Sequence, residues 1–276
     1  MPNPPGRPPE IEPWSNRLVV HRLSAALLPK AIHSGIAPNV VSVFGLGLGL
    51  AAALAYTHWY EPLWATVGFL LMIGWHVMDG LDGALARATG RTSDFGRLVD
   101  GIADYTTFVA VNIALALTSP YPWAAMGLAV ISGCAHILQS LFYEAGRETY
   151  IRRIAGRFDS TPRRDVGGFV ERLYNRGERW LGNRTRPFDG MLASAPPAQR
   201  AEMLAHWREK AAPRMMMLTP LSANGRTLAI WIACLMGSPI FYWAWEIVAL
   251  TLLALVGGRW LRQAERDLTA ATQAGG

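Results

Sequence analysis

The sequence predicts an all-α, polytopic membrane protein with six transmembrane helices, an N-terminal interfacial helix and a helical cytoplasmic insert. Of its 276 residues, 51% are hydrophobic and only 17% are charged. The apolar residues gather in long uncharged stretches, each close to the ~20 residues that a helix needs to cross a bilayer. Arginine-rich segments separate alternate stretches, which is the pattern of a chain that crosses a membrane several times.

The apolar stretches define the expected spans. They cover residues 39–57, 62–82, 96–118, 122–143, 218–236 and 239–261. The loops that join the first and second, third and fourth, and fifth and sixth spans are short and contain none of the 26 Lys and Arg residues. By the positive-inside rule, both termini and the segment between the second and third spans face the cytoplasm. We therefore expect a multi-pass cytoplasmic (inner) membrane protein.

The N-terminal region divides into two parts. Residues 1–13 are rich in proline and polar residues, so we expect a disordered, extended tail. Residues 14–35 set apolar side chains such as Trp14 and Leu18 against Arg17 and Arg22, which is typical of an amphipathic helix in the membrane interface. The alternative is an ordinary cytoplasmic helix that leads into the first span. Residues 36–143 then contain the first four spans.

Residues 144–217 form a polar insert. Residues 218–276 follow it and contain the last two spans and a C-terminal tail. The beginning of the insert should continue the fourth span as a helix. Two further helices are expected at 167–181 and 197–211, with Ser194 as a start signal for the second. The insert contains no enzymatic motif, so we interpret it as a cap or docking surface.

The charge and cysteine content narrow the function classes. The net charge of +6 would suit nucleic acid, but the basic residues lie beside apolar spans. Membrane lipids are therefore the expected partner, and nucleic acid is not. The two cysteines, Cys134 and Cys234, both lie in predicted spans and do not suggest a disulfide framework.

Four aspartates stand where charge is expensive: Asp79, Asp82, Asp100 and Asp104. An Asp at the centre of a membrane helix costs roughly 2.5–3.5 kcal/mol. Each pair is spaced by three or four residues and so shares one helix face, and the turn at 87–96 would bring the pairs together. Two divalent ions would balance the four charges. Carboxylate ligands favour Mg²⁺ or Mn²⁺, with Ca²⁺ as a further option. The alternative is an acid cluster that only pairs with arginines.

The spacing of these residues resembles a family signature. The pattern is Asp79-x2-Asp82-Gly83-x2-Ala86-Arg87-x8-Gly96-x3-Asp100-x3-Asp104. It is similar to that of the CDP-alcohol phosphotransferases. The resemblance implies metal-dependent transfer of a phosphatidyl group from CDP-diacylglycerol to a small hydroxyl acceptor, with release of CMP. It also implies a homodimer. In this family Asp79, Asp82 and Asp100 would be metal ligands. Asp104 would be the general base and could reach the second metal.

Further residues are expected at the nucleotide. Gly83 and Ala86 are small residues, so the nucleotide can approach this helix face closely. Arg87 can donate two parallel hydrogen bonds to the pyrophosphate. The resemblance adds Ser93 as a nucleotide contact, and Asn39 and Ser42 near the cytidine. Asn39 could equally be the N-cap of the first span.

The acceptor is less defined. A phosphorylated polyol such as glycerol 3-phosphate or inositol phosphate is weakly favoured, and it would need cations from Arg147, Arg152, Arg153 and Arg226. These arginines could instead only enforce topology. Two other functions remain open, namely transfer of a CDP-linked head group to a lipid alcohol, and cation transport without catalysis.

Three features outside the motif have structural interpretations. The glycines at 45, 47 and 49 resemble a phosphate loop, but their position in a span favours helix packing. His76 precedes Asp79 by one turn and could orient a carboxylate or simply pack. Glu246 is an acid within a span that we expect to have no base nearby, and it could face the bundle interior or an acceptor channel.

Overall fold

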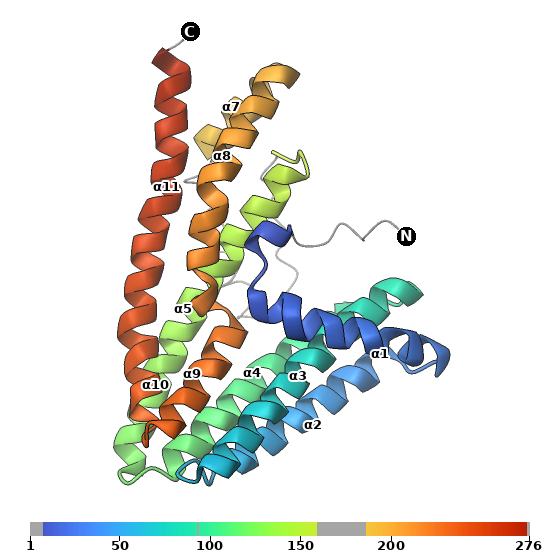
Figure 1. The fold of residues 1–276 in the computed structure, drawn as a ribbon, viewed down its shortest axis with the longest axis vertical. Coiled ribbons are helices and arrows are strands. Elements are labelled where there is room, and N and C mark those ends of the chain that lie inside the picture. Colours follow the sequence, from blue (N-terminus) through green and yellow to red (C-terminus); the bar gives the residue numbers. More distant parts are fainter. Residues whose placement is uncertain (1–7, 93, 159–185, 275–276) are drawn as a thin grey trace. The chain divides into compact units, whose positions relative to one another are not determined.

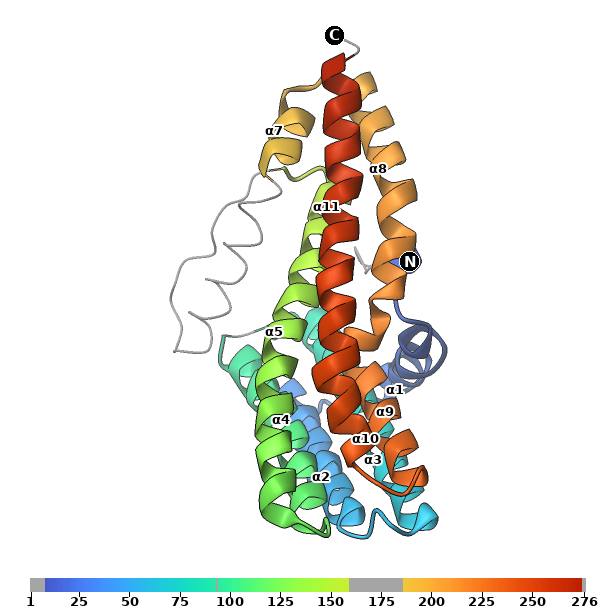
Figure 2. The same cartoon turned by 90° about the vertical axis from the view of Figure 1, so that its left-hand side faces the viewer.

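A computed structural model describes the backbone of residues 8–92, 94–158 and 186–274, and the side chains of 8–92, 103–158 and 187–269. All regular secondary structure in these residues is helical, which confirms the predicted fold class. The helices group into two compact units (Figures 1 and 2). We call Pro13–Ala135 with Ala223–Ile247 the aspartate unit. We call Met1–Glu12 with His136–Ser222 and Val248–Gly276 the insert unit.

The aspartate unit contains most of the helices of the predicted membrane core. In chain order they are η2 (Asn16–Val20), α1 (His21–His33), α2 (Pro38–Tyr56), α3 (Pro62–Thr89), α4 (Asp94–Leu117), the first part of α5 (Pro122–Ile154), α9 (Ala223–Leu235) and α10 (Ile240–Ala244). Prolines begin α2, α3 and α5, where the missing N–H costs no hydrogen bond. The last helical residue of α3 is followed by Gly90 with φ 67°, a left-handed conformation that glycine adopts readily.

Glycines on α2 allow the helices of this unit to approach closely. A Cβ added at Gly45 would lie 3.0 Å from Met78 Cβ on α3, and one added at Gly49 would lie 2.9 Å from Thr107 Cβ on α4. Gly47, on another face, has no atom within 4 Å of such a Cβ. The packing interpretation of this glycine run is therefore confirmed at Gly45 and Gly49. As a result α2 packs against both helices that carry the aspartates.

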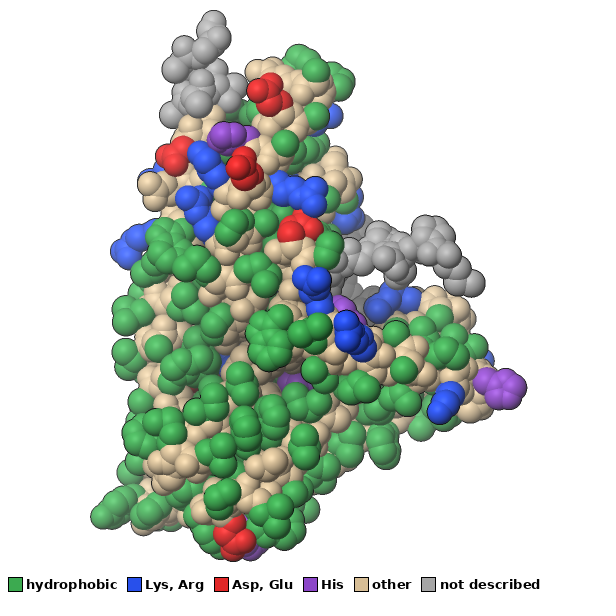
Figure 3. All heavy atoms as spheres, viewed as in Figure 1, with side chains coloured by type: hydrophobic (Ala, Val, Ile, Leu, Met, Phe, Trp, Pro, Cys, Tyr) green, Lys and Arg blue, Asp and Glu red, His purple; other side chains and the backbone are tan. Residues whose placement is uncertain are grey.

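The insert unit is a second helical assembly. It contains η1 (Pro9–Ile11), the rest of α5, α7 (Arg186–Ser194), α8 (Pro197–Met217), η3 (Thr219–Leu221) and α11 (Thr251–Ala274). The π-helix η4 (Trp245–Leu250) leads into α11. Helix α8 packs against both α7 and α11. Charged side chains gather over α8, whereas hydrophobic side chains cover the visible face around α3 and α9 (Figure 3).

The helices test the predicted spans. Within the described residues, four helical stretches are long and apolar enough to cross a membrane: Pro38–Tyr56, Pro62–Thr89, Pro122–Ile154 and Ile240–Thr269. The described part of α4, Ala103–Leu117, is a shorter apolar helix. Helix α9 has only 13 residues and is shorter than the span predicted at 218–236. The first residues of that predicted span form η3 and the extended Ser222 instead. The count of six spans stays a prediction.

Three local predictions differ from the structure. Part of the tail predicted to be disordered is ordered, because Ile11, the last residue of the short helix η1, and the following Glu12 are almost fully buried. Ser194 does not start a helix. It is the last residue of α7, and its hydroxyl donates to the carbonyls of Gly190 and Met191. Asn39 is not an N-cap, because α2 already begins at Pro38.

Other predicted elements are present. A helix covers the amphipathic segment as η2 and α1, and Trp14, Leu18 and Leu23 are exposed on it. Its position in the membrane interface stays a prediction. Helix α5 continues to Ile154, as expected for the beginning of the insert, and α8 covers the helix predicted at 197–211. The helix predicted at 167–181 lies outside the described residues.

Candidate active site

Helix α3 presents the first aspartate pair near its C-terminal end. Asp79 and Asp82 are three residues apart and therefore lie on one face of α3. Asp82 is only 5% exposed, and its Oδ2 accepts a hydrogen bond of 2.5 Å from the hydroxyl of Ser42 on α2. A buried carboxylate is costly unless hydrogen bonds or cations compensate its charge. Ser42 therefore restrains the position of Asp82, whereas its contact with the nucleotide stays a prediction.

Helix α4 carries the second pair. Its backbone is helical from Asp94, so positions 100 and 104 share a face. Asp104 is partly buried. The side chain of Asp100 lies outside the described residues. Among the side chains that are described, no group of three or more His, Cys, Asp or Glu could hold a metal ion. The meeting of the two pairs around metal therefore stays a prediction.

The predicted nucleotide residues on α3 lie next to each other. A Cβ added at Gly83 would come within 3.2 Å of Arg87 Nη1, so the guanidinium of Arg87 lies over the bare backbone of Gly83. Arg87 is exposed and Ala86 is partly buried. Asn39 is partly buried at the beginning of α2. The side chain of Ser93 lies outside the described residues.

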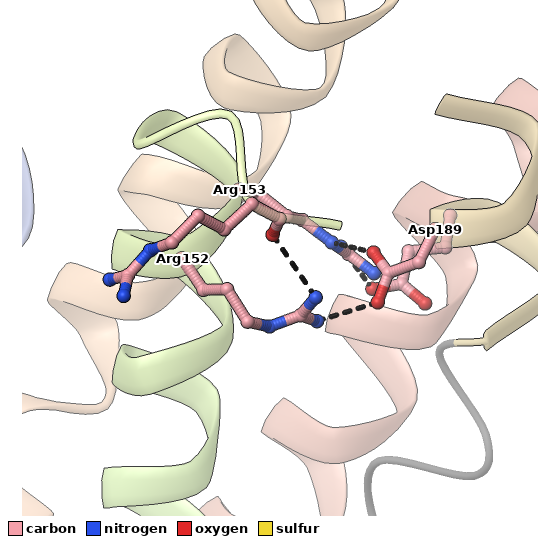
Figure 4. A network of polar contacts seen from close by, with 5 residues as sticks. Arg152, Arg153 and Asp189 are labelled. Atoms are coloured by element: carbon pink, nitrogen blue, oxygen red, sulfur yellow. Dashed lines mark hydrogen bonds and ion pairs between the residues drawn. The ribbon is translucent and has the colours of Figure 1, made fainter. Parts of the chain in front are cut away.

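Two of the predicted acceptor arginines belong to a buried network in the insert unit (Figure 4). Arg153 is fully buried, and its Nε and Nη1 lie 2.6 Å from Asp189 Oδ1 on α7 and Glu265 Oε1 on α11. Its guanidinium also lies over the rings of Phe188 and Trp207, at 4.9 and 4.8 Å. Arg152 Nη2 donates to the other oxygen of Asp189 at 2.5 Å.

The other two acceptor candidates also have carboxylate partners. Arg147 Nη1 lies 3.0 Å from Glu144 Oε1, one turn earlier on α5. Arg226 on α9 is fully buried, and its Nε lies 2.9 Å from Glu246 Oε1 in η4. The expectation that Glu246 has no base nearby is therefore wrong, because the fold brings it to a residue 20 positions earlier. The acceptor role of these four arginines stays a prediction.

His76 does not act as an isolated packing residue. It is buried one turn before Asp79, and its Nε2 lies 2.9 Å from Thr227 Oγ1 on α9. Sequence analysis could not find this contact, nor that of Ser42 with Asp82. The partners are 151 and 40 positions apart, and no helical periodicity links such positions.

Comparison with known proteins places the site in a family. The family model of CDP-alcohol phosphatidyltransferases matches residues 35–160, which contain all four motif aspartates. CDP-diacylglycerol–serine O-phosphatidyltransferase of Encephalitozoon cuniculi is 33% identical over 149 residues, covering 51% of this chain and 36% of that protein. Archaetidylinositol phosphate synthase of Pyrococcus horikoshii is 34% identical over 97 residues, covering 35% of this chain and 50% of that protein.

A third relative is the phosphatidylinositol phosphate synthase of Mycobacteroides abscessus, which is 27% identical over 154 residues. This match covers 56% of the present chain and 63% of that protein. The chain thus spans between about a third and two thirds of the length of these relatives. No solved structure matches the chain. The motif and the family match fall on the same helices, and residues 35–160 of this chain are similar to the CDP-alcohol phosphatidyltransferase family.

Proposed function

We propose that this protein transfers the phosphatidyl group of CDP-diacylglycerol to a small hydroxyl acceptor and releases CMP. The observation that carries this proposal is the pair Asp79 and Asp82 on one face of α3, with the buried Asp82 held by Ser42. Both helices of this contact lie within the family-matched segment. A carboxylate that is held in one orientation is well suited to bind a metal ion, because metal sites require their protein ligands in a fixed geometry.

The motif residues suit a divalent cation by their chemistry. The motif supplies only carboxylate oxygens, which suit Mg²⁺ or Mn²⁺. We propose two ions, with Asp79, Asp82, Asp100 and Asp104 as their ligands. When bound, these ions would neutralise charge on the pyrophosphate and on the leaving CMP.

The chain itself would orient the donor and accept a proton. Arg87, lying over Gly83, can donate two parallel hydrogen bonds to the pyrophosphate. Gly83, Ala86, Ser93, Asn39 and Ser42 would line the CDP site. The acceptor hydroxyl attacks the lipid-side phosphorus as its proton passes to Asp104. A phosphorus–oxygen bond to the acceptor forms while the bond to the CMP oxygen breaks.

The acceptor that we favour is a phosphorylated polyol. Two of the relatives are named as inositol phosphate lipid synthases, whereas a third is named for serine. Among the four predicted arginines, Arg147 is the best candidate for a phosphate contact. Arg147 is itself buried, but its partner Glu144 is about half exposed and is therefore the most accessible partner among the four. Arg152, Arg153 and Arg226 have buried carboxylate partners, so a direct contact from them would cost more.

We further propose the cellular setting. The protein would lie in the cytoplasmic membrane with the active site and both termini facing the cytoplasm, and it would form a homodimer. The exposed apolar side chains of η2 and α1 support contact of that segment with membrane lipids.

The test is CMP release from CDP-diacylglycerol by the purified chain in detergent, with Mg²⁺ or Mn²⁺ and a panel of acceptors. We expect release that requires metal and is fastest with glycerol 3-phosphate or inositol phosphate. Release with serine alone would contradict the favoured acceptor class only. Activity with a CDP-linked head group and diacylglycerol, but not with CDP-diacylglycerol, would replace the proposed reaction. Metal-dependent cation flux in vesicles without CMP release would overturn the enzymatic function altogether.

A further inference from the structure

We propose that Thr227 and Trp243, which lie outside the family-matched segment, are positioning residues for the aspartates. They belong to the hairpin formed by α9 and α10 and make buried polar contacts with α3 and α4, the two helices that carry the motif. This inference rests on the proposed function, because it concerns the geometry of the proposed metal ligands. All its contacts lie within the aspartate unit.

The contact with α3 is made by Thr227. Its Oγ1 lies 2.9 Å from Nε2 of His76, and Thr227 is fully buried while His76 is 5% exposed. His76 precedes Asp79 by three residues, a rise of about 4.5 Å along the helix. Because the His76 ring also contacts the Trp75 ring, with centroids 4.3 Å apart, it has little freedom to move. The hydrogen bond therefore restrains the turn of α3 that leads into Asp79 and Asp82.

The contact with α4 is made by Trp243. Its Nε1 donates a 2.9 Å hydrogen bond to Oδ1 of Asn112. The amide nitrogen of Asn112 in turn donates to the carbonyl of Phe108, one turn beyond Asp104. Trp243 is fully buried, so a lost partner could not be replaced by water without cost. The hydrogen bond therefore restrains α4 about two turns beyond Asp104.

A buried ion pair holds the hairpin in one arrangement. Arg226, adjacent to Thr227, pairs with Glu246, which lies three residues beyond Trp243. Both side chains are fully buried. Buried ion pairs contribute little net stability but can specify a single packing arrangement. Trp75 and Phe108 add a direct contact between α3 and α4, with ring centroids 5.5 Å apart.

These contacts lead to a geometric consequence. The hairpin bonds to α3 one turn before its aspartate pair and to α4 at Asn112, about two turns beyond Asp104. The distance between the two carboxylate pairs therefore depends on residues outside the family-matched segment. Metal sites need their ligands held to within about 0.5 Å, so small shifts of either helix should weaken metal binding.

The test compares Thr227→Val and Trp243→Phe with a matched control, Thr66→Val. Thr66 accepts a 3.2 Å hydrogen bond from Trp231, so it joins the same helix pair, α3 and α9. It lies thirteen residues before Asp79, about 20 Å along the helix. Bound Mn²⁺ is measured by electron paramagnetic resonance of the detergent-purified protein, beside CMP release and the thermal unfolding midpoint.

We expect the half-saturating Mn²⁺ concentration to rise about 3- to 10-fold in Thr227→Val and in Trp243→Phe. This is less than the ~10–100-fold typical for groups that bond a metal ligand directly. Thr66→Val should bind Mn²⁺ like the wild type, and Thr227→Ser should restore wild-type binding. If Thr227→Val fails to fold, the Mn²⁺ binding of Trp243→Phe and Thr227→Ser is compared with that of the wild type and Thr66→Val instead.

Three results would overturn parts of the argument in distinguishable ways. Wild-type protein that neither binds Mn²⁺ nor releases CMP refutes the proposed function and, with it, this inference. Wild-type binding and turnover, with unchanged Mn²⁺ binding in Thr227→Val and Trp243→Phe, refutes the positioning role alone. Equal weakening by Thr66→Val also refutes it, because the effect would then reflect general loss of packing.

Discussion

The carboxylate of Asp82 combines two features that single residues rarely share, burial inside an apolar helix pair and a short hydrogen bond from Ser42. The family resemblance predicts that Ser42 lies near the cytidine, and the structure adds its contact with a motif aspartate. A hydroxyl that orients a ligand oxygen affects metal affinity, whereas one that contacts only the nucleotide affects substrate binding.

Ser42→Ala should therefore weaken Mn²⁺ binding about 10-fold, because Asp82 loses the bond that fixes its orientation. Titration of bound Mn²⁺ without nucleotide measures this. Ser34→Ala is the control, since the Ser34 hydroxyl bonds only a carbonyl of its own helix turn. Unchanged Mn²⁺ binding with a raised KM for CDP-diacylglycerol would assign Ser42 to the nucleotide instead.

Asp104→Asn should abolish turnover, because an amide is a far weaker proton acceptor than a carboxylate. Mn²⁺ binding should stay within about threefold of wild type, because the amide oxygen can still coordinate the ion and the other three carboxylates remain. CMP release and metal titration on the same preparation measure the two effects. Asp267→Asn, at an exposed position of α11, serves as the matched control. Wild-type turnover in Asp104→Asn would refute its assignment as the general base.

At the scale of elements, the approach of α2 to α4 depends on one glycine. A Cβ at Gly49 would meet Thr107 at both its Cβ and its Cγ2, so no rotation of the Thr107 side chain relieves the overlap. Gly47, two residues earlier, has open space. The same glycine run therefore contains one critical position and one tolerant position.

Gly49→Ala should destabilise the protein by about 1–3 kcal/mol and lower activity, because α2 must move away from α4. Gly47→Ala should be neutral or stabilising by up to about 1 kcal/mol, since alanine favours the helix. Thermal unfolding in detergent compares the two. Equal stability of both variants would mean that α2 and α4 are not held at this distance.

The insert unit depends in the same way on Arg153, which joins α5 to α7 and α11. Arg153→Ala leaves Asp189 and Glu265 buried without this partner and should cost about 3–5 kcal/mol. Arg208→Ala removes an exposed ion pair with Glu10 in the same unit and should cost at most about 1 kcal/mol. Chemical unfolding in detergent measures both. A small effect of Arg153→Ala would show that the insert helices pack without this network.

At the scale of the whole molecule, topology follows from helix length and charge. Helix α3 has 28 residues and is therefore about 42 Å long, enough to separate its ends across a bilayer. Tyr60 lies just before it and Arg91 just after it, and both are exposed. The positive-inside rule predicts that the Arg91 end faces the cytoplasm.

This topology predicts the labelling of single cysteines in a background in which Cys134 and Cys234 are replaced by alanine. An impermeant maleimide should label Tyr60→Cys and Tyr121→Cys from the outer side of intact spheroplasts. Arg91→Cys should react only after permeabilisation. Labelling of Arg91→Cys in intact spheroplasts would reverse the proposed orientation.

The sequence by itself determined the helical fold class, the positions of most helices and the aspartate motif. Each depends on local spacing, because apolar runs, helix-starting prolines and carboxylates three or four residues apart are read within one helix. Its errors at Ser194 and in the proline-rich tail arose where tertiary contacts order the chain.

Only the tertiary structure decided which side chains become partners. Ser42 meets Asp82, His76 meets Thr227 and Glu246 meets Arg226 across 40, 151 and 20 positions. Such pairs form because helix packing excludes water and requires each buried polar group to find a partner. That requirement is met in space between neighbouring helices, and no periodicity along a single helix records it.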